Sequence, residues 1–158
     1  DNMFFLARLV GAPSDLSIDY LSGYIKEKGL ENNIIVVGPR FDDNKFLEFH
    51  NADIFVFPTY YENETFGIVN LEAMQYKLPI ISSHEGGIPE IVIENKTGFI
   101  INPKDINLLA DKLRVLINNS SLRKEMGENS FRRFNDNYTI EHFEINMRNA
   151  FNAILQRA

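Results

Sequence analysis

The chain has 158 residues, of which 44% are hydrophobic and 24% are charged, and its formal net charge is -6 at pH 7. This length is that of one domain with an ordinary core, and the composition is that of a folded globular protein. The acidic balance argues against a nucleic-acid-binding protein, because phosphate contacts need clustered Lys and Arg. The basic residues gather only in the pairs Arg123-Lys124 and Arg132-Arg133, which we expect on solvated helix faces.

The residue types that bind metals or form disulfides are scarce. The sequence contains no cysteine, which excludes disulfides and thiolate metal sites and fits a cytoplasmic protein. The three histidines, His50, His84 and His142, share no metal-ligand spacing, so we expect no metal. No run approaches the roughly 18 apolar residues of a membrane span, and we expect no signal peptide ahead of the first strand.

Short apolar runs alternate with stretches of helical periodicity along the chain. Strands are predicted at residues 3–10, 33–37, 53–57, 80–83 and 97–101. Helices are predicted at residues 16–28 and 45–51, from Gly67 to Leu78-Pro79, and after caps at Asp105, at Ser120 or Ser121, and at Thr139. We expect the apolar stripes of the last helices to make core contacts. This alternation predicts an α/β fold with a mostly parallel sheet, against which the C-terminal helices pack.

The unusual polar residues lie in two loops, which follow the strands at 53–57 and 80–83. In a parallel sheet both loops lie at the carboxyl ends of the strands, where ligands bind. The first N–H groups of the following helix, at Gly67, Ile68 and Val69, combine with the helix dipole to suit a phosphate or diphosphate. Dinucleotide and P-loop folds fit poorly, because residues 11–15 are not G-x-G-x-x-G and no G-K-[ST] occurs.

Two carboxylates flank this helix start. Glu64 lies just before it, and Glu72 lies about one turn inside it, ~6 to 8 Å along the axis. Carboxylates bind vicinal hydroxyls and repel phosphates, so the pattern favours a ligand with hydroxyls on both sides of an anionic centre, such as a nucleotide sugar. The second loop adds Gly86 and Gly87, whose backbone can close over the same ligand.

Each of these signals alone also has a plainer interpretation. The two glutamates are typical of helix-dipole partners or surface charges. Gly86-Gly87-Ile88-Pro89 is typical of a turn into a short helix with proline at its first position. Tyr60, Tyr61 and Phe66 are typical of a partly exposed aromatic cluster.

Several strings along nearly the whole chain keep the order and spacing of one enzyme family. They are residues 52–58, 64–74, 79–82, 86–90 and 97–99, with Pro103 and Asp105, and they include a Glu-x7-Glu motif at Glu64 and Glu72. Together they resemble the group 1 (family 4) glycosyltransferases. The resemblance implies a GT-B enzyme of two Rossmann-like domains, of which residues 1–158 are the C-terminal, donor-binding one, a parallel sheet flanked by helices with a helical C-terminus.

Such enzymes transfer a sugar with retention of configuration, without a metal or other cofactor. The resemblance implies a hexosyl group from a UDP- or GDP-sugar as the donor. It implies a glycan, lipid-linked sugar or small molecule as the acceptor, bound by an N-terminal domain. The parent enzyme would work in the cytoplasm or at the inner face of the membrane, as in polysaccharide biosynthesis.

The resemblance also assigns roles to residues. Glu64 would be catalytic, contacting the hydroxyls of the donor sugar in an electrostatic and positioning role. Glu72 would bind the ribose hydroxyls. The remaining donor-binding residues would line the diphosphate and the pocket, mainly through their backbone: Thr65, Phe66, Gly67, Ile68, Val69, Gly86 and Gly87.

The chain departs from the family pattern at its start. The family carries an Arg and a Lys in a pattern like R-L-x-x-x-K-G, whereas Arg8-Leu9 is not followed by Lys-Gly. The register that fits places residues 6–11 on the family's second strand, so that the first strand-helix unit and both cations precede Asp1. We therefore expect a fragment that is inactive alone and self-associates. Two alternatives are a nucleotide-sugar epimerase of GT-B fold and a non-catalytic sugar-nucleotide-binding module.

Overall fold

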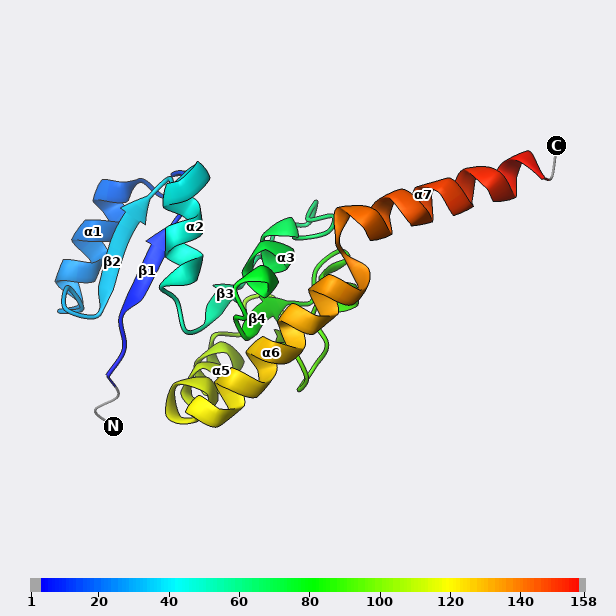
Figure 1. Ribbon diagram of the computed structural model, residues 1–158. Helices are drawn as coiled ribbons and strands as arrows, with labels where there is room; N and C mark the ends of the chain where they lie inside the picture. Colours follow the sequence, from blue (N-terminus) through cyan, green and yellow to red (C-terminus); the bar gives the residue numbers. More distant parts are fainter. Residues whose placement is uncertain (1–3, 157–158) are drawn as a thin grey trace. The chain divides into compact units, whose positions relative to one another are not determined.

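The computed structural model describes residues 4–156 (Figure 1). The chain forms two compact units, of which the first ends at Asn51 and the second begins at Ala52. Every strand pairing in both units is parallel among these residues, which confirms the predicted α/β class.

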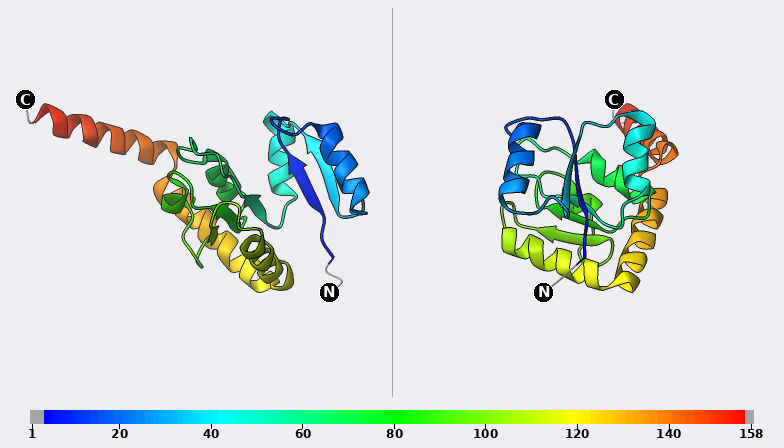
Figure 2. Two further views of the ribbon diagram at one scale, coloured as in Figure 1. Left: turned by 180° about the vertical axis from the view of Figure 1, so that it is seen from behind. Right: turned by 90° about the vertical axis from the view of Figure 1, so that its left-hand side faces the viewer.

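The first unit is a pair of parallel strands with two helices. Its elements are β1 (Ala7–Val10), α1 (Ile18–Glu27), β2 (Ile34–Gly38) and α2 (Asp42–His50). One helix lies on each side of the two strands (Figures 1 and 2). Arg8 of β1 donates two hydrogen bonds to the carboxylate of Glu48 in α2. The nitrogen-to-oxygen distances are 2.6 and 2.8 Å. This ion pair holds the pKa of the Glu48 carboxyl below its ordinary value.

The second unit is a three-stranded parallel sheet with five helices among the described residues. Its elements are β3 (Phe55–Phe57), α3 (Ile68–Gln75), β4 (Ile80–Ser83), α4 (Ile88–Ile91), β5 (Gly98–Ile101), α5 (Ile106–Asn118), α6 (Ser120–Asn137) and α7 (Ile140–Leu155). The strand order is β3-β4-β5, with β4 in the centre. All four residues of β4 are buried, including Ser82 and Ser83, as expected for a central parallel strand that is covered on both faces.

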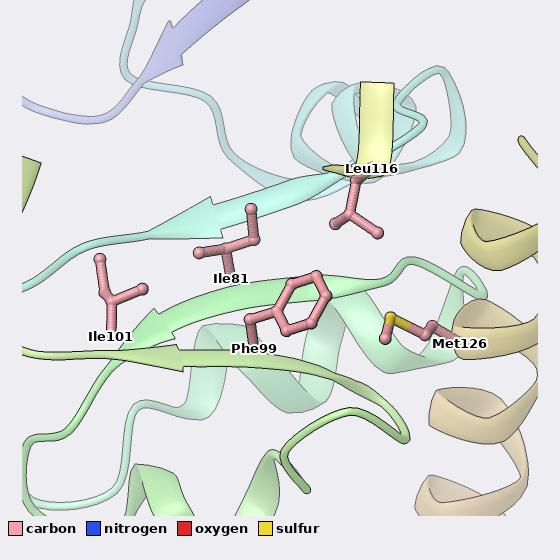
Figure 3. Close-up of a cluster of buried hydrophobic side chains, with 5 residues drawn as sticks. All are labelled: Ile81, Phe99, Ile101, Leu116 and Met126. Carbon is pink, nitrogen blue, oxygen red and sulfur yellow. The ribbon is translucent and has the colours of Figure 1, made fainter. Parts of the chain in front are cut away.

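A buried cluster joins the sheet of the second unit to α5 and α6 (Figure 3). Ile81 of β4 and Phe99 and Ile101 of β5 meet Leu116 of α5 and Met126 of α6. Leu109 and Leu113, which repeat at helical spacing along α5, pack against this cluster from the same helix face. These contacts fix the two long helices against the sheet.

Glycine lets the main chain approach closely at one helix contact of this unit. A Cβ on Gly127 of α6 would lie 2.0 Å from the carbonyl oxygen of Lys77, just after α3. The helix therefore packs on the end of α3 with its backbone rather than with a side chain.

Most predicted elements are confirmed, with small differences at their ends. The strand at 80–83 has the predicted bounds, and Asp105 and Thr139 cap α5 and α7 through their side chains. The predicted cap of α6 at Ser120 or Ser121 is wrong, because the side chain of Asn119 accepts the N–H of Leu122 and the serines lie inside the helix. The first strand begins at Ala7, and Met3, where we predicted its start, lies outside the described residues.

The predicted core packing of α7 is wrong for the described residues. None of its residues is buried, although its apolar side chains recur at the predicted helical spacing. Phe143 and Phe151 are 60% and 59% exposed. The pattern indicates a face that can be buried, and the described part of the chain leaves that face open.

We expect Gly127→Ala to lower the free energy of unfolding by about 1 to 3 kcal/mol, since the added methyl overlaps the carbonyl of Lys77. Gly23→Ala is the matched control, because Gly23 also lies inside a helix but has no neighbouring atom within 4 Å of its missing Cβ. That change should raise stability by about 0.5 to 1 kcal/mol. Circular dichroism during urea unfolding measures both, and a Gly127→Ala protein as stable as the wild type would contradict the packing.

Candidate functional site

Three loops of the second unit leave the sheet at the same edge. The strands β3, β4 and β5 are parallel and in register, so their carboxyl ends lie side by side. Residues 58–67 lead to α3, residues 84–87 to α4 and residues 102–105 to α5. Lys104 of the third loop lies over the ring of Tyr60 of the first, 4.9 Å from its centroid. The residues predicted to bind a donor lie in the first two of these loops and in α3.

The first two loops meet backbone to backbone. The N–H of Gly87 donates to the carbonyl of Thr65 at 2.8 Å. Gly86 has φ +49°, and a Cβ there would lie 2.0 Å from the carbonyl oxygen of Glu64. A side chain at this position would overlap that carbonyl, so glycine is required. The two predicted glycines therefore hold the loop after β4 against the loop after β3.

The helix α3 begins at a glycine in the left-handed conformation. Gly67, with φ 67° and ψ 53°, precedes the first helical residue. Its carbonyl accepts a hydrogen bond from Nδ2 of Asn70 at 2.9 Å. Ile88 of α4 lies buried against it, since a Cβ on Gly67 would be 2.8 Å from Cγ1 of Ile88. The N–H groups of Ile68 and Val69 have no partner inside the helix and lie at its positive end.

Glu64 bridges the loop to this helix start. Its Oε1 accepts the N–H of Gly67 at 2.9 Å, and the residue is half-buried. The plainer interpretation of the glutamates, as partners of a helix terminus, therefore holds in part for Glu64. Glu72 is also half-buried and lies four residues after Ile68 in α3, about 6 Å further along the axis. Along the chain, the two carboxylates thus lie on either side of the first N–H groups of α3.

Phe66 contacts residues from two other segments. Its ring meets the ring of Tyr138 edge to face, with centroids 6.4 Å apart and planes at 68°. A Cβ on Gly87 would lie 3.0 Å from Cδ2 of Phe66, so the glycine also makes room for this ring. Tyr60, Tyr61 and Phe66 are all exposed, as the plainer interpretation of these aromatic residues predicts.

Sequence reasoning missed a buried polar side chain at the helix start. Asn70 is fully buried, and its Oδ1 has no hydrogen-bond partner among the described residues. A polar residue within the apolar run Ile68, Val69 and Leu71 was the available signal, because buried amides are normally paired. Its Nδ2 fixes the carbonyl of Gly67 and so supports the left-handed turn.

The prediction that both basic pairs lie on solvated helix faces is wrong for one arginine of each pair. Arg123 donates to the carbonyls of Leu116 and Ile117 at the end of α5, and Arg133 donates to those of Glu90 and Ile91 at the end of α4. Carbonyls at helix ends lack partners inside their own helix, so each arginine satisfies two of them. Arg133 therefore belongs to the structure that surrounds the candidate site.

Residues 4–156 contain neither a group of side chains that could hold a metal ion nor a helix that could span a membrane. Within that range no group of three or more His, Asp or Glu side chains is placed to hold a metal ion. No described helix combines the length and the apolar character that crossing a membrane requires. Arg8, the residue that resembles a catalytic cation in the sequence, is engaged by Glu48 within the first unit.

Comparison with known proteins gives this arrangement a family context. The family model of the group 1 glycosyl transferases matches residues 8–133. The capsular polysaccharide biosynthesis glycosyltransferase CapM of Staphylococcus aureus is 29% identical over 126 residues, which is 80% of this chain and 32% of that protein. The chain therefore spans about a third of the length of this relative.

Solved structures match the fold of the chain. The C-terminal domain of the group 1 glycosyl transferase LpcC from Francisella tularensis has a TM-score of 0.73 and 32% identity, covering 85% of this chain and 70% of that one. A mutant of Staphylococcus aureus TarM, solved in complex with fondaparinux, alpha-GlcNAc-glycerol and UDP, has a TM-score of 0.77 and 25% identity, covering 92% and 28%.

We expect Gly86→Ala to destabilise the junction between the two loops by about 1 to 3 kcal/mol, because it adds both a carbonyl overlap and a strained positive φ. Gly87→Ala is the control in the same loop, since its φ is negative and its nearest contact is the ring of Phe66 at 3.0 Å. Thermal unfolding should show a clearly larger loss for Gly86→Ala. Equal losses would argue against the close backbone contact at Glu64.

Proposed function

This chain belongs to the group 1 glycosyltransferases, and from that premise we propose that it supplies the donor site of a retaining, metal-independent hexosyltransferase. The observation that carries the proposal is the junction of the two loops at the start of α3. There the backbone of Glu64 and Thr65 meets Gly86 and Gly87, and Gly67 opens the helix. The donor in this proposal is a nucleoside-diphosphate sugar.

The diphosphate binds at the start of α3 in this proposal. The N–H groups of Ile68 and Val69 and the helix dipole supply hydrogen bonds and positive potential there. The glycine at position 67 brings the ligand close to the backbone, and Thr65 and Phe66 continue the binding segment. Gly86 and Gly87 close the other side. The UDP present in the TarM complex is the same class of ligand.

The two carboxylates bind the hydroxyl-bearing ends of the donor. Glu72, about one turn inside the helix, binds the ribose hydroxyls. The carboxylate of Glu64 already holds the N–H of Gly67 through Oε1, which fixes its position next to the diphosphate. It meets the hydroxyls of the donor sugar and acts by electrostatic stabilisation and positioning.

The acceptor is a glycan, a lipid-linked sugar or a small molecule, bound by a part of the parent enzyme beyond this chain. The relative CapM is named for capsular polysaccharide biosynthesis, which supports a polysaccharide pathway. A second candidate is a non-catalytic sugar-nucleotide-binding module.

Calorimetric titration of the chain with UDP and with GDP tests the donor site. We expect one nucleotide to bind and Glu72→Ala to weaken its binding by about 10-fold or more, since hydrogen bonds to a charged group are lost. Glu125→Ala is the control, because Glu125 is an exposed glutamate of α6. Failure of both nucleotides to bind would contradict the proposal that this chain holds the site alone.

We also propose that the isolated chain self-associates. Leu9 and Val10 of β1 are 41% and 42% exposed, and the apolar face of α7 is open among the described residues. Exposed strands and apolar faces of this kind pair with other chains. Light scattering across a range of concentrations should give a mass above 18.2 kDa that rises with concentration. A constant monomer mass would disprove this proposal.

A further inference from the structure

We propose that Arg133 and Tyr138 are positioning residues of the donor site, which act by holding α4 and the loop before it. This inference rests on the proposed function, since the loop they hold carries Gly86 and Gly87. Both residues lie at the end of α6, more than 40 positions after the segment they bind. Neither belongs to the motifs that identify the site in the sequence.

The contacts of Arg133 secure the carboxyl end of α4. Its Nε donates to the carbonyl of Ile91 at 2.8 Å, and its Nη2 donates to the carbonyl of Glu90. The same Nη2 donates to the hydroxyl of Tyr138 at 3.1 Å. A helix as short as α4 leaves its last carbonyls unpaired, and a planar guanidinium can satisfy two of them at once.

Tyr138 connects this point to the other loop. Its hydroxyl donates to the carbonyl of Glu90 at 2.8 Å, so Glu90 accepts from both residues. Its ring packs edge to face on Phe66, whose backbone precedes the left-handed Gly67. Tyr138 therefore touches α4 with its hydroxyl and the loop before α3 with its ring.

The path from these residues to the site is short. The helix α4 begins at Ile88, which is buried against Gly67, and Gly87 before it is bonded to Thr65. Because α4 has only four residues, hydrogen bonds that fix its last residues also restrict the position of Ile88 and Gly87. These two residues in turn contact the backbone of the loop before α3. A site whose N–H groups are ordered before the ligand arrives loses less entropy on binding, so release of this hold weakens nucleotide binding.

Arg123 provides a matched control within the same unit. Its Nη1 donates to the carbonyls of Leu116 and Ile117 at 2.7 and 2.9 Å, so it secures the end of α5 as Arg133 secures that of α4. Arg133→Lys and Arg123→Lys both keep the charge and lose the planar fork. Only the first should affect the loops, because the carbonyls that Arg123 binds lie at the end of α5.

The test combines amide hydrogen exchange with titration of the full chain. In Arg133→Lys we expect amide exchange at Gly67 and Gly87 to rise about 10-fold, with little change in β4. The N–H of Gly87 donates to Thr65 across the junction, and the N–H of Gly67 donates to the Glu64 side chain next to it. Where the wild type binds UDP or GDP, the same variant should weaken binding by about 10-fold. In Arg123→Lys both readouts should stay at wild-type values.

Tyr138→Phe keeps the ring contact with Phe66 and removes the hydrogen bond to Glu90, so it gives the same test if Arg133→Lys fails to fold. Unchanged exchange at Gly67 and Gly87 would overturn the inference, and so would faster exchange with unchanged nucleotide affinity. A wild-type chain that binds neither nucleotide contradicts the proposed function instead, and the exchange measurement still decides whether the residues hold the loops.

Discussion

The candidate site depends on the close approach of two backbones, where Gly86 and Gly87 lie against the carbonyls of Glu64 and Thr65. A parallel sheet brings the two loops to one edge, but it does not by itself bring their main chains into contact. That contact needs a residue without a side chain at 86 and a positive φ. Next to this contact, Ile88 packs against Gly67, which precedes α3 in the left-handed conformation. The side chain of Glu64 accepts a hydrogen bond from the N–H of the same glycine. The carboxylates, the helix start and the glycines are therefore parts of one packed junction.

Features set by neighbouring residues could be predicted from the sequence, and features set by distant ones could not. The strand at 80–83 and the caps at Asp105 and Thr139 depend on local periodicity and on bonds that span three residues, so their signals lie within short windows. The fold class and the two site loops followed from the same kind of signal. Arg133 instead finds its acceptors 42 and 43 residues away, and Arg8 finds Glu48 40 residues away. Nothing in the sequence around an arginine indicates which distant carbonyl or carboxylate it will bind.

The last helix shows a different limit of sequence reasoning. Its apolar spacing correctly indicates a helix with one apolar face, but burial is a property of that face and of whatever covers it. Among the described residues nothing buries α7, whereas the equally periodic α5 packs on Ile81, Phe99 and Ile101 (Figure 3). The difference between the two helices lies in their neighbours and not in their own residues.

The junction of the two loops, and the contacts of Arg133 and Tyr138 that hold it, use mainly main-chain acceptors. The backbone shape of the site therefore depends little on which side chains these accepting residues carry. Thr65 and Glu90 contribute carbonyl oxygens to these contacts, and both side chains are exposed. Substitutions at such positions can change the exposed groups at this edge while the backbone that carries them keeps its course. The surface chemistry of this edge and the fold of the unit can therefore vary independently of each other.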